Sequence, residues 1–227
     1  MTTFESVFAA FASGDGELYK ILGLTVCMTL LSTGFSVLAG FPAGAVLASV
    51  SFPGKKLLRR IIQTCMGLPP VVAGLFVFLL LSRRGPMGSL QLLFSLPAMV
   101  IAQFILIFPI VTSLTLAAIE SRQKAINQTI STLGLPRYKI YLLLLWECRG
   151  SLLTVVLTGF GRSLSEVGAV MMVGGNIQGK TRVMTTAIML ETSKGNFGAA
   201  IALGLVLLIM AFLVNAIANR FQEAQND

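Results

Sequence analysis

Five apolar stretches, each long enough to cross a lipid bilayer, dominate this 227-residue sequence. A helix that crosses the hydrocarbon core needs about 20 mostly apolar residues. The stretches run from about residues 21 to 50, 57 to 81, 92 to 119, 150 to 173 and 199 to 218. Charged residues make up only 11% of the chain, less than half of the roughly 25% found in soluble domains, so they could not cover a solvated surface. The sequence therefore predicts an all-α integral membrane protein that crosses the bilayer five times, with one transmembrane domain over residues 21–220.

The distribution of lysine and arginine predicts the orientation, because these residues are enriched in cytoplasmic loops. Ten lie in one alternate set of loops, namely Lys55, Lys56, Arg59, Arg60, Arg122, Lys124, Arg137, Lys139, Arg149 and Arg220. Six lie in the other set, namely Lys20, Arg83, Arg84, Lys180, Arg182 and Lys194. The N-terminus is therefore expected outside and the C-terminus inside. A basic loop, 120–149, and a short tail, 221–227, then face the cytoplasm.

The first twenty residues carry no basic region of the kind that opens a cleavable signal peptide. Phe4, Phe8 and Phe11 recur at helical spacing and share one face. This pattern predicts that residues 1–20 form an external amphipathic segment on the outer leaflet. Within the basic loop, the apolar patch 140–146 is too short to cross the membrane and predicts an interfacial helix.

Composition argues against an enzyme. The chain has no histidine, only nine acidic residues and three cysteines without a C-x-x-C pair, so no catalytic, metal-binding or cofactor site is expected. The net charge of +8 fits the cytoplasmic loops of a membrane protein, and no nucleic-acid partner is expected.

Proline and glycine inside the apolar stretches allow two interpretations. Gly40 and Gly44, four residues apart, favour close approach of a neighbouring helix in a tight bundle of kinked helices. Alternatively, broken helices border a polar central cavity, because proline frees backbone groups that need partners at membrane depth. The segment 67–70, Gly-Leu-Pro-Pro, is the best candidate for such a break.

Arg162 and Glu166 place opposite charges inside the fourth apolar stretch, four residues apart. Each buried charge costs about 2.5–3.5 kcal/mol on insertion scales, so compensation is expected. One interpretation is a self-neutralising pair that packs against a neighbouring helix. The other is a water-accessible solute route lined by Arg162, Ser163, Ser165 and Glu166.

Residues 174–181 match the pattern G-x-x-x-x-G-K-[ST] of nucleotide-binding loops. That pattern binds phosphate only between a buried strand and a helix, with an aspartate elsewhere for magnesium. Here it follows a membrane helix on the outer side, with no aspartate before Asp227. The sequence therefore predicts a glycine-rich turn that could offer a surface to an external partner.

Several motifs resemble those of the permease subunits of type I ABC importers. Residues 128–139 form a helical run, a break at Gly134 and a basic-aromatic restart. This resembles the family's cytoplasmic coupling loop, whose motif is E-A-A, three residues, then glycine. Residues 161–169 (GRSLSEVGA) resemble a segment of the oxyanion branch, which handles molybdate, tungstate and sulfate. Residues 174–188 and 190–197 are most similar to tungstate permeases.

The coupling loop departs from the family motif at its start. Gln128 stands where the motif has glutamate, and Thr129 and Ile130 replace its two alanines, whereas Leu133 and Gly134 are kept. In importers of this family the coupling loop docks on a separate ATP-binding subunit. Without the glutamate, docking of this loop would rest on shape and hydrogen bonds rather than on a salt bridge.

The resemblance implies a permease homodimer around a central route, driven by separate cytoplasmic ATP-binding subunits. The residues implied in ATPase coupling are Gln128, Leu133, Gly134, Leu135, Pro136 and Arg137. An external tungstate-binding protein would dock on the outer loops, where Asn176, Lys180 and Arg182 are the candidate contacts.

Two alternatives stay open at this point. A permease for molybdate or another oxyanion would have nearly the same features, because both substrates are tetrahedral dianions. A self-sufficient channel or secondary carrier is the alternative from another class, although carriers commonly show inverted repeats and no repeat is visible here.

Overall fold

A computed structural model describes residues 16–133 and 137–223, and within these ranges every regular element is a helix. The elements are α2 (Gly16–Ser49), α3 (Lys55–Met66), α4 (Pro70–Leu81), the 3₁₀ turn η1 (Gly88–Leu90), α5 (Leu96–Leu133), α6 (Arg137–Glu147), α7 (Arg149–Leu164), α8 (Gly168–Gly174), α9 (Met184–Ser193) and α10 (Phe197–Glu223). The predicted all-α class is confirmed for these residues. The segment 1–15, with the three phenylalanines, lies outside them.

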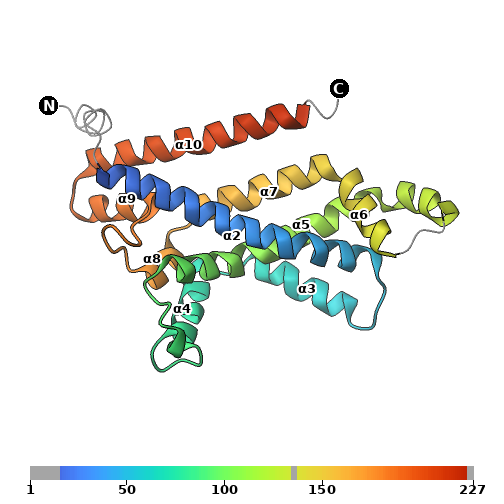
Figure 1. Cartoon of the computed structure of the whole chain (residues 1–227), viewed down its shortest axis with the longest axis horizontal. Coiled ribbons are helices and arrows are strands. Elements are labelled where there is room, and N and C mark those ends of the chain that lie inside the picture. Colours follow the sequence, from blue (N-terminus) through green and yellow to red (C-terminus); the bar gives the residue numbers. More distant parts are fainter. Residues whose placement is uncertain (1–15, 134–136, 224–227) are drawn as a thin grey trace.

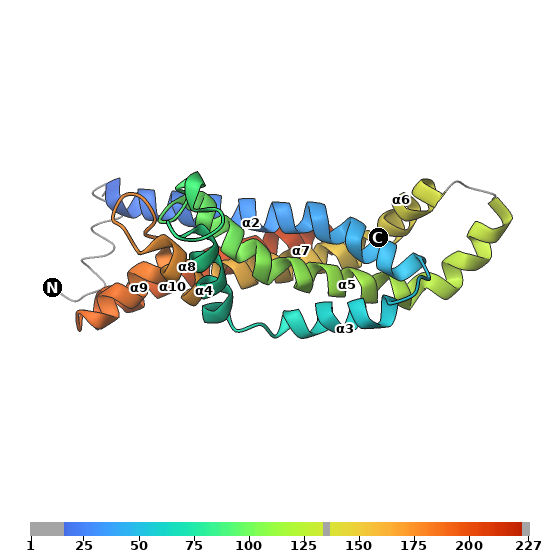
Figure 2. The same cartoon turned by 90° about the horizontal axis from the view of Figure 1, so that it is seen from below.

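The bundle is elongated, with α2, α5, α7 and α10 running along its long axis and α4 turned across it (Figures 1 and 2). Long helices are what an apolar sequence must form in lipid, because each backbone N–H and C=O needs a partner inside its own helix. In the described part of the chain, three helical segments are long and apolar enough to cross a membrane: Gly16–Ser49, Leu96–Arg122 and Phe197–Ala218.

The other two predicted spans are broken. The second bends by 102° between α3 and α4, at the Gly-Leu-Pro-Pro segment that the sequence singled out. Pro70 has no N–H to continue the preceding helix, and it stands at the first position of α4, where none is needed. The fourth predicted span, 150–173, is not one helix: α7 ends at Leu164 and α8 begins at Gly168.

The described parts of the segment 120–149 are largely helical rather than an open loop. Helix α5 continues past its apolar part to Leu133, and α6 returns from Arg137 to Glu147, which includes the predicted helix at 140–146. These two helices extend beyond the rest of the bundle at one end (Figures 1 and 2). The ion pair between Arg122 and Glu147, with 3.8 Å between Nη1 and Oε1, joins their bases.

Helices α2 and α5 pack at the closest approach that glycine allows. A Cβ atom at Gly40 would lie 2.7 Å from Val111 Cγ1, and one at Gly44 would lie 2.7 Å from Thr115 Cβ and 2.8 Å from the backbone oxygen of Thr112. The prediction that these two glycines permit close helix packing is confirmed.

Replacing Gly44 with leucine is therefore expected to lower the stability of the bundle by about 3 kcal/mol, because the backbone oxygen of α5 cannot move aside as a side chain can. The measurement is thermal unfolding of the purified protein in detergent. Gly34→Leu is the matched control in the same helix, since a Cβ there meets nothing within 4 Å. Equal melting temperatures for the two variants would contradict the packing argument.

The largest buried apolar cluster joins α4, α5 and α8. Its fully buried members include Val77, Met99 and Val170. A Cβ at Gly74 would lie only 2.8 Å from Ala169 Cα, so α4 and α8 pack backbone against backbone. This contact fixes the two short helices that follow the two breaks.

Candidate functional site

The two helix breaks lie side by side. A Cβ at Gly168, the first residue of α8, would lie 3.1 Å from Val71 Cγ2 and 3.7 Å from the Val71 nitrogen in the first turn of α4. The break at 67–69 and the break at 165–167 are therefore neighbours within the bundle, although about a hundred residues separate them in the sequence. The break at 165–167 joins the two halves of the fourth predicted span, and Arg162 and Glu166 lie at this junction.

Glu166 is buried and shapes the start of α8. Its Oε2 accepts a hydrogen bond from Arg162 Nη1 at 2.9 Å, and its Oε1 accepts one from the N–H of Ala169 at 3.1 Å. The hydroxyl of Thr185 donates to the backbone oxygen of Glu166 at 2.9 Å. These bonds satisfy backbone groups that the break would otherwise leave without partners.

Arg162 differs from its partner in exposure. Its side chain keeps 34% of its surface accessible, against 4% for Glu166. These two charges form an ion pair, as one of the two interpretations of the sequence expected, although the residues belong to the end of α7 and the turn after it rather than to one helix. The result is a buried anion that holds a half-exposed cation at the junction of two breaks.

Ser163 and Ser165, the two serines of the same segment, point into different surroundings. Ser163 is only 1% exposed; its hydroxyl bonds to Gln103 Oε1 and lies 2.8 Å from Ser32 Oγ, and Gln103 Nε2 donates to its backbone oxygen at 3.0 Å. It therefore joins α7 to α2 and α5. Ser165 is exposed, and its hydroxyl donates to the backbone oxygen of Arg162 at 3.3 Å.

Sequence reasoning missed this three-helix junction. Ser32 and Gln103 are both fully buried, and they meet Ser163 across separations of 131 and 60 residues. One signal was present: Gln103 is the only amide side chain in the apolar stretch 92–119. A lone amide at membrane depth needs partners on neighbouring helices.

The nucleotide-loop pattern at 174–181 forms a turn between α8 and α9. Thr181 is fully buried, and its hydroxyl accepts from the N–H of Ile177 at 2.9 Å and donates to the backbone oxygen of Gly174 at 2.6 Å. Gly175 and Asn176 take positive φ angles of 69° and 50°. A helix precedes the turn instead of a strand, and its threonine hydroxyl is used internally, so the predicted glycine-rich turn is confirmed.

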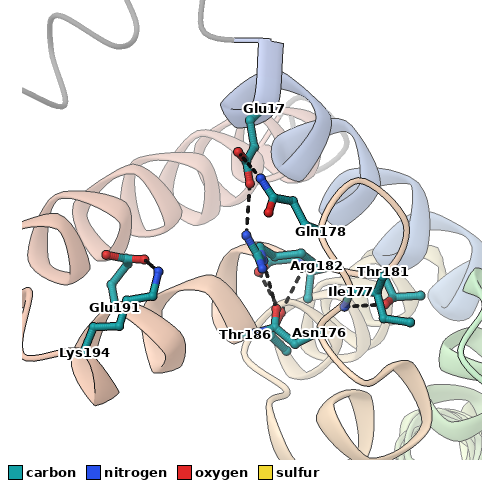
Figure 3. A network of polar contacts seen from close by, with 10 residues as sticks. Glu17, Asn176, Ile177, Gln178, Thr181, Arg182, Thr186, Glu191 and Lys194 are labelled. Carbon is teal, nitrogen blue, oxygen red and sulfur yellow. Dashed lines mark hydrogen bonds and ion pairs between the residues drawn. The ribbon is translucent and has the colours of Figure 1, made fainter.

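The same turn is tied to the start of α2 by a polar network (Figure 3). Arg182 Nη1 lies 3.0 Å from Glu17 Oε1, and Arg182 Nε donates to Asn176 Oδ1 at 3.3 Å. Gln178 Nε2 donates to Glu17 Oε2 at 2.6 Å. Of the three residues predicted to contact an external partner, Arg182 and Asn176 thus make bonds within the chain, and Lys180 is exposed.

Three carboxylates elsewhere in the described residues each have a basic neighbour. Arg59 donates to both oxygens of Glu120, at 2.9 and 2.8 Å, and Glu147 pairs with Arg122. The hydrogen bond from Lys194 lowers the pKa of Glu191 below its usual value. The described part of the chain holds no group of three or more Cys, Asp or Glu residues that could bind a metal.

The predicted coupling residues are only partly described. Gln128 and Leu133 lie in the last turns of α5, and Arg137 is the first residue of α6. Gly134, Leu135 and Pro136 lie outside the described residues, as do the side chains of the other three.

Three apolar helices of membrane length, together with two helix breaks that meet beside the Arg162–Glu166 ion pair, are typical of a polytopic membrane transport protein. A family model described as "binding-protein-dependent transport system inner membrane component" matches residues 40–226, and the chain belongs to this family. It is the inner-membrane permease component of an ABC importer, which works with ATP-binding and solute-binding partners. Permease components of this family are not enzymes, because ATP is hydrolysed by a separate subunit of the importer.

Individual relatives narrow this further. The chain is 39% identical over 220 residues to the tungstate uptake system permease protein TupB of Peptoclostridium acidaminophilum, covering 97% of this chain and 96% of that protein. It is 41% identical over 172 residues to TupB of Campylobacter jejuni, covering 76% and 72%. Among solved structures, the inward-facing MetNI methionine ABC transporter matches with a TM-score of 0.72 at 17% identity, covering 91% of this chain and 95% of that one, which indicates a shared fold.

Proposed function

We propose that this chain is the permease subunit of an ATP-driven importer for tungstate. The observation that carries the proposal is the 39% identity to a tungstate uptake permease over 97% of the chain. The geometry supports it, because Arg162, which is partly exposed at the junction of two helix breaks, provides a positive charge that an anion within the membrane could contact.

The anion route passes Arg162 and Ser165, where the two breaks meet. Arg162 attracts the dianion, and the buried carboxylate of Glu166 limits how tightly it is held, since a transported ion must also leave. Ser163 supports the route indirectly, because its bonds to Gln103 and Ser32 fix the helix turn that carries Arg162.

In this proposal the chain crosses the membrane five times in one domain, 21–220, with the N-terminus outside. The crossings are α2, the bent pair α3–α4, α5, α7 with the return helix α8, and α10. The two sets of basic residues support this orientation. The start of α3, helix α6 and the end of α10, which belong to the ten-residue set, gather at one end of the bundle (Figure 1). The start of α2 and α9 lie at the other end.

Two copies of the chain form the route, and cytoplasmic ATP-binding subunits receive the segment from Gln128 to Arg137. A helix of this segment that sits in a groove of the ATP-binding subunit would transmit the closure of the ATP-binding subunits to the permease. An external tungstate-binding protein docks near Lys180, on the turn that the Glu17 network holds in place. Transport is then a switch between two packings of the bundle, with the breaks as hinges.

Reconstitution tests this function. The permease, its ATP-binding subunit and its solute-binding protein are placed in proteoliposomes, and tungstate accumulation is measured with and without ATP. ATP-dependent accumulation that needs all three proteins is expected, and molybdate added in excess reports the competing oxyanion. Uptake by the permease alone, without nucleotide, would instead establish a channel or secondary carrier.

A further inference from the structure

An apolar groove of about 850 Å³ lies between α7 and α10. It is lined by residues of α2, α6, α7 and α10, namely Phe41, Leu142, Leu145, Trp146, Arg149, Leu152, Leu153, Val156, Val214, Ile217 and Ala218. Exposed apolar side chains such as Leu142 (64%) and Ile217 (58%) stand on its rim. The groove therefore opens onto a surface that suits hydrocarbon.

Polar groups gather at one end of this groove. Arg149 is its only charged lining residue, and the Arg149 guanidinium carbon lies 5.1 Å from the centre of the Trp146 ring, with both side chains exposed. Arg220 is also exposed and follows Ile217 by three residues, on the same face of α10. The start of α7 and the end of α10 lie at the same end of the bundle (Figure 1).

From this end the groove enters the apolar part of the bundle. Val156 lies seven residues along α7 from Arg149, which is about 10 Å at the helical rise of 1.5 Å per residue. The wall along this path is entirely aliphatic or aromatic. The site thus combines a cationic, aromatic mouth with a hydrocarbon interior, and tryptophan and arginine are the residues that anchor at the level of lipid headgroups.

We propose that this groove binds an anionic phospholipid, with one acyl chain between α7 and α10 and the phosphate at Arg149 and Arg220. Charge complementarity selects this occupant, because basic pockets between transmembrane helices bind acidic headgroups. A helix of a second copy would bring an apolar face into the groove but would leave the arginine mouth without a partner. The site is separate from the anion route and does not depend on which oxyanion is transported.

The single tryptophan of the sequence, Trp146, provides the test. The full chain is placed in phosphatidylcholine nanodiscs that contain a minor fraction of brominated phosphatidylglycerol or brominated phosphatidylcholine, and quenching of Trp146 fluorescence is measured. The brominated anionic lipid is expected to reach half-maximal quenching at about thirtyfold lower content, since the two arginines near the membrane surface are worth about 1 kcal/mol each.

Variants and a control distinguish the contribution of the headgroup contact from that of the acyl-chain contact in the groove. Arg149→Gln is expected to reduce the preference for the anionic lipid to about fivefold, because Arg220 remains, and Arg149→Gln/Arg220→Gln is expected to abolish it. Arg84→Gln, which removes an exposed arginine after α4, keeps the full preference. Val156→Phe narrows the groove and reduces quenching by both lipids. Equal quenching by both lipids in the unchanged protein would overturn the proposal. So would the absence of quenching in discs with two copies together with strong quenching in discs with one, because the occupant would then be a second copy of this chain.

Discussion

The double variant Arg162→Gln/Glu166→Gln is expected to fold normally and to lose about a hundredfold in tungstate uptake. The uptake loss follows from removing the cation that the proposed route offers to the anion, because a hydrogen bond to a charged group is worth about 1.5–3 kcal/mol. The fold survives because a glutamine at position 166 keeps an amide oxygen that accepts the N–H of Ala169, as Glu166 Oε1 does now. Uptake is measured in proteoliposomes with both partner proteins, and folding by size-exclusion chromatography and melting temperature.

The two single variants distinguish the role of the charges in transport from their role in stabilising the fold. Arg162→Gln leaves the buried Glu166 carboxylate without its cation, a change that costs about 3–5 kcal/mol in comparable pairs, so a loss of stability is expected. Glu166→Gln leaves Arg162 unpaired, so the anion is held more tightly: the half-saturating concentration and the maximal rate of uptake both fall. If the double variant transports tungstate at the rate of the unchanged protein, Arg162 is not part of the anion route and has only a packing role.

The helices that the sequence predicted well are those that local physics determines. Helices α2, α5 and α10 follow from long apolar stretches, because a chain in lipid must pair its backbone within each helix. The break before α4 was visible in the adjacent Pro69 and Pro70, which lack the N–H groups that would continue α3. Single prolines do not break the chain in this way, since Pro42 and Pro109 lie inside α2 and α5. The close approach of α2 and α5 was visible in Gly40 and Gly44 for a similarly local reason.

The break in the fourth predicted span depends on contacts that spacing alone does not reveal. The stretch from Gly150 to Val173 is apolar enough to be interpreted as one helix, whereas in the structure the Glu166 carboxylate accepts the N–H of Ala169 and so stabilises a new helix start at α8. Thr185, nineteen residues later, holds the backbone of the same turn. The sequence therefore offered the Arg162–Glu166 pair as one of two interpretations and did not predict the helix end between them.

Distant partners also changed the interpretation of exposed polar residues. Arg182 was expected to meet an external protein, yet it is bound to Glu17 across 165 residues, a pairing that no local pattern encodes. Ser163 was expected on the route, and its hydroxyl makes bonds that join α7 to α2 and α5, which the sequence did not predict. A single sequence gives the chemistry of each residue, whereas the partner of a buried polar group is decided by the packing of whole helices.

Replacing Gly134 with leucine is expected to separate ATP hydrolysis from transport almost completely. Residues 134–136 join the end of α5 to the start of α6, two helices that extend beyond the bundle and that we propose as the ATPase contact. A bulky side chain at this connection would displace the docked helix from its groove on the ATP-binding subunit, so that closure of that subunit no longer moves the permease. The reconstituted complex should therefore hydrolyse ATP while tungstate accumulation falls to background.

Gly150→Leu is the matched control for that experiment. Gly150 lies in the first turn of α7, after the same helical hairpin, and a Cβ there meets nothing within 4 Å. It should leave both hydrolysis and uptake unchanged, which shows that added bulk at this end of the bundle is not harmful in itself. If the Gly134 variant accumulates tungstate as fast as the Gly150 variant, ATP hydrolysis is not coupled to transport through the connection between α5 and α6. The contact with the ATPase must then be sought elsewhere on the basic end of the bundle, where the start of α3 with its Arg59–Glu120 pair would be the next surface to examine.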